Sequence, residues 1–209
     1  MSRTVTRLFD KFTDAEAAVS ELERMGVPHA DISMVASNAE GAHAHAPHPV
    51  AGDHAHDAGK DASRGAKVGG VVGGGAGLLA GLGMLAIPGL GPVVAAGWLI
   101  STAVGAVVGA AAGGATGGLI DSLTHAGVSK EDAHVYTEGV RRGGTLVSAR
   151  VDDGRYAEVE AALQRFNAVD AATCGGAYRA AGWSAFDPAA PAYTTEQVVR
   201  ERTQYTPRV

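Results

Sequence analysis

Hydrophobic and polar positions alternate near the start of the chain and then change to a helical spacing. Residues Thr4–Phe9 have the composition and pattern of a strand. Thr13 and Glu16 have the spacing of a capping box, which predicts that a helix starts there, and Gly26 would end it. The apolar face of this helix would consist of Ala15, Ala18, Val19, Leu22 and Met25. A half-buried strand is expected next, over 32–36.

The second half of the chain repeats these patterns. They predict a helix over Ser129–Arg142, a strand over Thr145–Val151, a helix over Tyr156–Phe166 and a strand over Val169–Cys174. Four strands and three helices indicate an α+β fold. We expect a small split α/β sandwich, ferredoxin-like or related, that is interrupted in the middle.

The interruption is a long uncharged segment, residues 68–120. Two prolines and two glycines within residues 87–92 predict a turn that divides it into two arms, 68–87 and 93–120. Each arm, as a helix, is long enough to cross a bilayer core of about 30 Å. The sequence therefore predicts a Gly/Ala-rich helical hairpin of membrane-spanning length.

Small residues recur at every fourth position of both arms, which would give each helix a smooth packing groove. These helix-packing positions are Gly69, Gly73, Gly77, Gly81, Gly97, Ser101, Gly105, Gly109, Gly113 and Gly117. The pattern is typical of a glycine zipper and predicts a homo-oligomer. Two environments remain open for it, membrane lipid and the interior of a soluble oligomer.

Charge around the hairpin predicts its orientation in a membrane. Lys60, Arg64 and Lys67 precede the first arm, whereas the turn carries no charge. The positive-inside rule then places both flanks, and both termini, in the cytoplasm. If the hairpin does not insert, the alternative location is cytoplasmic.

A histidine-rich stretch lies before the hairpin, with Asp53 and Asp57 beside the imidazoles. Its histidines are His43, His45, His48, His54 and His56. Imidazole is a good ligand for zinc, nickel or copper, so weak metal binding is one interpretation. The spacing fits no defined metal site, and a disordered polar linker is the other interpretation.

Composition and motifs argue against several classes of function. The net charge is −5 and no basic face is visible, which excludes nucleic acid as an expected partner. The glycines of 73–77 lack the acidic residue of a dinucleotide site, and Lys67 lies outside any phosphate-loop pattern. Cys174 has no recognisable nucleophile motif. We therefore expect no catalytic residues and no cofactor.

The last part of the chain combines proline with the aromatic residues Trp183, Phe186 and Tyr193. Thr194 and Gln197 form a second capping box, which predicts a short helix. An arm that docks on this chain or on a protein partner is one interpretation, and a loose terminus is the other.

These patterns divide the chain into five parts. They are the first part of the α+β domain (1–37), the His-rich linker (38–64), the glycine-zipper hairpin (65–123), the second part of the domain (124–174) and a flexible tail with a short helix (175–209).

Short motifs across residues 3–174 carry a family resemblance. They are Leu8-Phe9-Asp10, Gly26-Val27-Pro28, Asp31-Ile32-Ser33-Met34-Val35, Glu131-Asp132-Ala133 and Gly143-Gly144. With the Gly/Ala hairpin, they resemble the bacterial general stress protein domain family, which includes heat-induced and low-temperature-induced proteins. The resemblance implies a stress-associated, membrane-linked protein and no reaction. Together with the hairpin and its flanking charges, it leads us to expect a non-enzymatic stress-response protein at the bacterial inner membrane, with a cytoplasmic scaffold or sensor domain. The alternative is a soluble self-assembling binding protein that sequesters metal through its histidines.

Overall fold

The computed structural model describes residues 2–41, 83–87, 89–99 and 118–205. Its elements are β1 (Ser2–Phe9), α1 (Phe12–Arg24), the 3₁₀ turn η1 (His29–Asp31), β2 (Ile32–Ser37), β3 (Gly83–Ile87), β4 (Gly91–Gly97), α5 (Gly118–His125), α6 (Lys130–Arg141), β5 (Thr145–Asp152), the 3₁₀ turn η2 (Asp153–Arg155), α7 (Tyr156–Gln164), α8 (Ala171–Ala180) and α9 (Thr195–Tyr205). This mixture of helices and antiparallel strands confirms the predicted α+β class.

The described strands form one five-stranded sheet in the order β1-β5-β2-β4-β3, and every neighbouring pair is antiparallel. Strand β5, from the second half of the chain, lies between β1 and β2 from the first half. Val5 is opposite Ala149, and Met34 is opposite Val147. The two halves of the sequence are therefore joined in one sheet.

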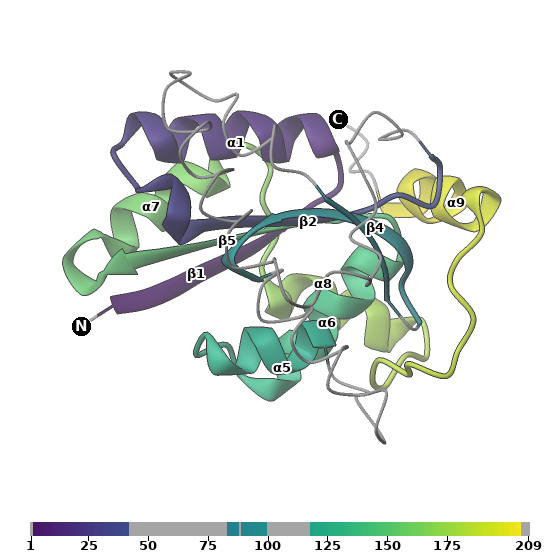
Figure 1. Ribbon diagram of the computed structural model, residues 1–209. Coiled ribbons are helices and arrows are strands. Elements are labelled where there is room, and N and C mark those ends of the chain that lie inside the picture. Colours follow the sequence, from purple (N-terminus) through teal and green to yellow (C-terminus); the bar gives the residue numbers. More distant parts are fainter. Residues whose placement is uncertain (1, 42–82, 88, 100–117, 206–209) are drawn as a thin grey trace, which may run out of the picture.

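Helices cover both faces of the sheet, and a separate apolar core lies under each set (Figure 1). Helices α1 and α7 pack on the face that carries Val5, Phe9 and Val147. Helices α5, α6 and α8 pack on the opposite face, against Leu8 and Leu146. Neighbouring strand residues alternate between these two cores, as the period of a strand requires.

Helix α1 has the apolar face that its spacing predicts, but its start differs. Ala15, Ala18, Val19 and Leu22 are all fully buried. The helix begins at Phe12 with Lys11 at the N-cap, and no side chain caps it. The capping box predicted at Thr13 is therefore wrong, because Thr13 already lies inside the first turn.

The ferredoxin-like four-strand arrangement is not confirmed, because the described sheet gains β3 and β4 and lacks the fourth predicted strand. Of the segment 169–174, only Val169 pairs with the sheet, through an isolated bridge to Leu8. Helix α8 follows directly, because the side chain of Asp170 accepts a hydrogen bond of 2.8 Å from the backbone N–H of Thr173 and caps the helix.

The predicted turn within residues 87–92 is present, but it joins two strands instead of two helices. Leu90 N–H donates to the carbonyl of Ile87 at 3.0 Å, and β4 pairs with β2 along Ser33–Ser37. Pairing with β4 satisfies the backbone N–H and C=O groups along this edge of β2, and a helix over residues 91–97 would leave those groups of β2 unpaired. The helical prediction is therefore wrong for residues 83–87 and 93–97.

The prediction that the hairpin spans a membrane is also contradicted. Among the residues that the structure describes, no helix combines the length and the hydropathy needed to span a bilayer. The remaining parts of the predicted arms, 68–82 and 100–117, lie outside the described residues. The inner-membrane location and the lipid partner depended on this hairpin and lose their support.

The described part of the tail packs on the domain, as a self-docking arm would. Phe186 and Val198 are 7% and 1% exposed. The capping box at the start of α9 is confirmed, because Thr194 N–H donates to the Gln197 side chain at 2.8 Å, and Gln197 N–H donates to the Thr194 hydroxyl at 3.3 Å. We refer to residues 182–205 as the C-terminal arm.

Candidate functional site

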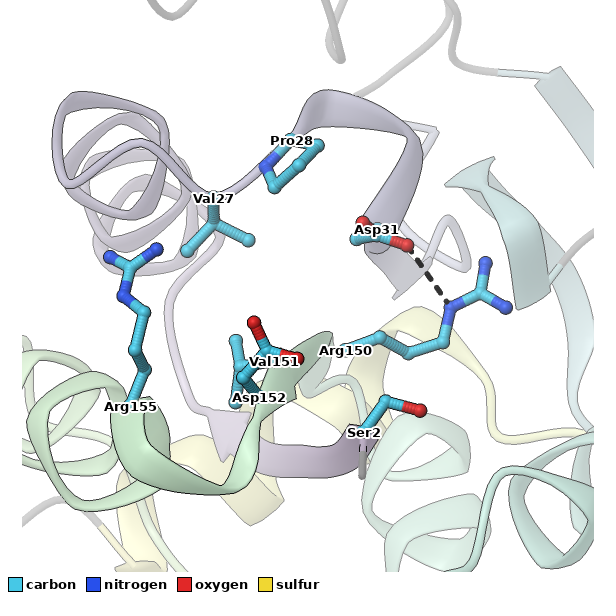
Figure 2. A pocket seen from close by; sticks show the side chains of 8 residues that line it. All are labelled: Ser2, Val27, Pro28, Asp31, Arg150, Val151, Asp152 and Arg155. Carbon is cyan, nitrogen blue, oxygen red and sulfur yellow. Dashed lines mark ion pairs between the residues drawn. The ribbon is translucent and has the colours of Figure 1, made fainter.

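A pocket of about 280 Å³ lies at the end of the sheet where β1 begins and β5 ends (Figure 2). Its lining combines acidic, basic, hydroxyl and apolar side chains from segments far apart in the sequence. The lining residues are Ser2, Val27, Pro28, Asp31, Arg150, Val151, Asp152 and Arg155. We call it the strand-end pocket.

Strand register brings these residues together. Ser2 on β1 is opposite Asp152 on β5. Ile32, the first residue of β2, is opposite Ala149, so the preceding residue, Asp31, lies beside Arg150. The pocket therefore forms where three strands begin or end.

Two connections build its walls. After α1, Gly26 adopts a φ of +81°, a conformation that favours glycine, and turns the chain toward Val27 and Pro28. On the other side, β5 continues directly into η2 and α7, which places Arg155 at the rim. Figure 2 shows these two connections facing each other across the pocket.

Arg150 is held in place by groups on both sides. Its Nε lies 3.5 Å from Oδ1 of Asp31, and its guanidinium lies over the ring of Trp98, 4.3 Å from the centroid. Trp98 is fixed in turn, because its indole N–H donates to the backbone carbonyl of Asp31 at 3.2 Å. Cation–π contact and ion pairing therefore fix the orientation of Arg150.

The Asp31 carboxylate keeps hydrogen-bonding capacity despite this pair. The buried Nε of Arg150 makes no hydrogen bond within the described part of the chain. The contact with Asp31 is thus an ion pair and not a hydrogen bond. Both carboxylate oxygens of Asp31 can still accept hydrogen bonds from a ligand.

Arg155 ties the ends of two helices together. It donates a hydrogen bond of 2.6 Å to the backbone carbonyl of Met25, at the end of α1, and its Nε lies 3.6 Å from a carboxylate oxygen of Glu158 in α7. A guanidinium has five N–H donors, so these contacts leave further donors for a ligand.

Asp152 is the acidic lining residue of the pocket that forms no ion pair with a described residue. Its side chain is exposed, and within residues 2–41, 83–87, 89–99 and 118–205 it has neither an ion pair nor a hydrogen bond. Figure 2 shows its carboxylate pointing into the space between Val27 and Asp31. A carboxylate in this position can accept hydrogen bonds from a cationic group.

These side chains are suited to binding more than to catalysis. The lining residues include one hydroxyl, that of Ser2, and no histidine or cysteine that could act as its base or replace it as a nucleophile. Two carboxylates and two guanidiniums balance in charge, and Val27, Pro28 and Val151 supply apolar contact. The pocket is thus a candidate site for a small polar ligand.

The site residues predicted from the sequence lie elsewhere. His43, His45, His48, His54 and His56 fall outside the described residues, so metal binding there stays a prediction. Titration calorimetry with zinc, on the full chain and on a chain without residues 38–61, tests it. The described residues alone contain no group of three or more His, Cys, Asp or Glu side chains that could hold a metal ion.

Gly97 is the helix-packing position that falls within the described residues, and its role differs from the prediction. It ends β4 with a φ of +88°, and a Cβ there would lie 2.2 Å from the backbone oxygen of Ile32. Gly97 therefore permits a close approach of β4 to β2 and not of two helices. The other predicted positions lie outside the described residues.

Cys174 is buried in the core under α6 and α8. Burial raises the pKa of its thiol from 9.0 to about 12. The thiolate is the nucleophilic form, and at neutral pH this thiol is protonated. Its environment is that of a packing residue.

The sequence patterns do not predict the pocket. The available signal was that two turns with acidic residues, 26–31 and 152–155, follow or precede predicted strands. This signal does not show which strands pair. The register between paired strands determines which side chains lie next to each other.

The chain was compared with protein-family models, with curated proteins and with solved structures, and none of them matches. The candidate site is therefore interpreted from its own geometry.

Proposed function

We propose that the protein is a non-enzymatic ligand-binding protein, a sensor of the bacterial general stress response, and that the strand-end pocket binds its ligand. The observation that carries the proposal is the carboxylate of Asp152, which has no partner within the described part of the chain, in a pocket whose arginines are held by other groups.

Preorganisation supports this proposal. Arg150 is fixed by Asp31 and Trp98, and Arg155 is fixed by the carbonyl of Met25. A site whose side chains are already ordered loses less conformational entropy when a ligand binds. Ordered arginines beside a carboxylate that pairs with no described residue favour a binding role over a purely structural one.

The position of the pocket suits a sensor. Its walls are the connection from α1 to β2 and the connection from β5 to α7. A ligand that contacts both walls would hold these connections together and stabilise the folded state by mass action. The resemblance of the sequence motifs supplies the stress context of the proposal, and the pocket supplies its molecular activity.

A ligand screen by NMR tests the proposed function. Amide resonances of the labelled full chain would be recorded with a library of small polar metabolites. We expect at least one class of compound to shift the resonances around Asp31 and Asp152 and to raise the melting temperature. If no compound in the library shifts them, the proposal fails.

Two variants sharpen this test. Asp152→Asn removes the negative charge of this side chain with little change in shape, and it should weaken binding by about tenfold or more. Asp121→Asn removes an exposed carboxylate on α5, on the opposite side of the sheet, and should leave binding unchanged. Equal effects of the two variants would contradict a role for the pocket.

A further inference from the structure

We infer that the ligand of the strand-end pocket is a small zwitterion of the α-amino-acid class, with its ammonium group at Asp152 and its carboxylate at Arg155. This inference rests on the proposed function and adds the chemical class of the ligand.

The acidic side of the pocket indicates an ammonium group. The Asp152 carboxylate points into the cavity and has no partner among the described residues, and Asp31 lies across from it with oxygens that can still accept. An ammonium has three donors, which can be shared between two carboxylates and the Ser2 hydroxyl. Charge-assisted hydrogen bonds of this kind are about twice as strong as neutral ones.

The basic side indicates a carboxylate on the same ligand. Arg155 stands on the opposite wall from Asp31, and its contacts with Met25 and Glu158 leave donors unused. The guanidinium fork matches a carboxylate in geometry. A ligand with only a positive charge would leave these donors without a partner.

The balance of charge excludes a simple anion. A phosphate or a dicarboxylate at Arg155 would share the pocket with the carboxylates of Asp31 and Asp152, and like charges within one small pocket repel. Arg150 does not offset this repulsion fully, because it already faces Asp31 and Trp98. Two opposite charges on one small molecule satisfy both sides of the pocket.

Size and apolar lining narrow the ligand further. Ligand pockets usually measure about 300–1,000 Å³, so a volume of about 280 Å³ fits a small metabolite better than a nucleotide. Val27, Pro28 and Val151 form the apolar part of the lining. We therefore expect a small aliphatic side chain, as in valine or leucine.

The test compares three molecules that share the same branched 3-methylbutyl chain and differ in their charged groups. Leucine carries both charges, 4-methylpentanoate lacks the amine, and isopentylamine lacks the carboxylate. Binding to the full chain would be measured by calorimetry and by shifts of the amide resonances around Asp31 and Asp152. We expect leucine to bind at least tenfold more tightly than either analogue.

Two variants assign the ends of the ligand. Asp152→Asn should weaken leucine binding about tenfold, whereas it should not weaken the binding of 4-methylpentanoate, because the variant removes a charge that repels this anion. Arg155→Lys keeps the charge but loses the fork, and it should weaken leucine and leave isopentylamine unaffected. Both variants are checked for an unchanged melting temperature without ligand, and Asp121→Asn serves as the control.

The outcomes separate this inference from the proposed function. If isopentylamine or 4-methylpentanoate binds as tightly as leucine, the zwitterion assignment is overturned and the pocket remains a binding site. If none of the three binds but another compound of the library shifts the same resonances, the ligand class is wrong and the proposed function stands. If no compound shifts them, both fail.

Discussion

The carboxylate of Glu138, which is 1% exposed, accepts a hydrogen bond of 2.8 Å from Nε of Arg142. The other carboxylate oxygen of Glu138 accepts a hydrogen bond of 3.3 Å from Nη1 of Arg141. Arg142 also donates to Glu201 of α9 at 2.8 Å, and its guanidinium lies 4.3 Å from the ring centroid of Tyr178. Burial lowers the pKa of Arg142, but the hydrogen bond that it donates to Glu138 and the negative charges of Glu138 and Glu201 together more than compensate, so the pKa of Arg142 is raised. This network connects α6 with α8 and with the C-terminal arm.

Removal of the buried carboxylate should destabilise the protein strongly. Glu138→Ala leaves two largely buried guanidinium groups without their main partner. Breaking a buried ion pair from one side costs about 3–5 kcal/mol, and we expect a loss of that size in the free energy of unfolding. Urea denaturation at pH 7 measures it.

An exposed ion pair provides the control for this variant. Glu131 pairs with Arg179 at the surface, and Glu131→Ala should cost at most about 1 kcal/mol. Similar losses for the two variants would show that the Glu138 network contributes no more than a surface pair.

The C-terminal arm depends on a glycine at its docking site. Gly143 has a φ of +100°, and a Cβ there would lie 2.3 Å from Cγ1 of Val198. We expect Gly143→Ala to push α9 off the domain, because the backbone strain and the clash add together. Limited proteolysis should then cleave residues 182–197 faster than in the unmodified chain.

Gly127→Ala is the matched control for the arm. Gly127 also has a positive φ, +90°, but a Cβ there meets nothing within 4 Å. This variant should cost about 1–2 kcal/mol of stability from backbone strain alone and leave the cleavage rate of the arm unchanged. Equal cleavage of both variants would contradict docking through Val198.

Local patterns in the sequence predicted the elements whose residues face a single core. The spacing of Ala15, Ala18 and Leu22 is sufficient to define the buried face of α1, because a helix satisfies its own backbone. The capping pair of Thr194 and Gln197 is equally local. Such elements need no information from distant parts of the chain.

Strand β4 and the strand-end pocket depend on distant partners, and neither was predicted. Residues 91–97 are small and apolar, which suits a helix or a strand equally, and pairing with β2 decides for the strand. The strand-end pocket has the same origin. Asp31 and Asp152 belong to separate turns, and only the position of β5 between β1 and β2 brings them together.

The contribution of Asp170 to the stability of α8 should depend on pH. The hydrogen bond from the Thr173 backbone N–H lowers the pKa of Asp170 below its ordinary value of 3.8. The contribution of the cap is therefore complete above pH 3.8 and is lost as the pH falls through the lowered pKa. Asp170→Ala should cost about 1 kcal/mol at pH 7.

Asp170→Asn separates the cap from its charge. Asparagine caps a helix about as well as aspartate and does not titrate. We expect this variant to keep most of the stability at pH 7 and to lose less between pH 4 and pH 2. Thermal denaturation across this range measures both effects, and an unchanged acid dependence would contradict the assignment to Asp170.

Two buried groups should make the protein sensitive to alkali. Burial raises the pKa of Cys174 from 9.0 to about 12 and that of the Tyr136 hydroxyl, which donates to the carbonyl of Thr6 at 2.8 Å, from 10.0 to about 12. In both cases the folded state favours the neutral form. Their contribution to stability is therefore complete below the ordinary values and is lost as the pH rises toward 12.

Cys174→Ala tests this dependence by removing one of the two groups. Each such group lowers the free energy of unfolding by about 1.4 kcal/mol per pH unit in the range between its unfolded and folded pKa values. The variant should be less stable at pH 7.5, because it loses a buried side chain, but its stability should fall less steeply between pH 9.5 and pH 11. Urea denaturation at several pH values gives the two slopes. Parallel slopes would mean that the Cys174 thiol ionises as readily in the folded chain as in the unfolded one.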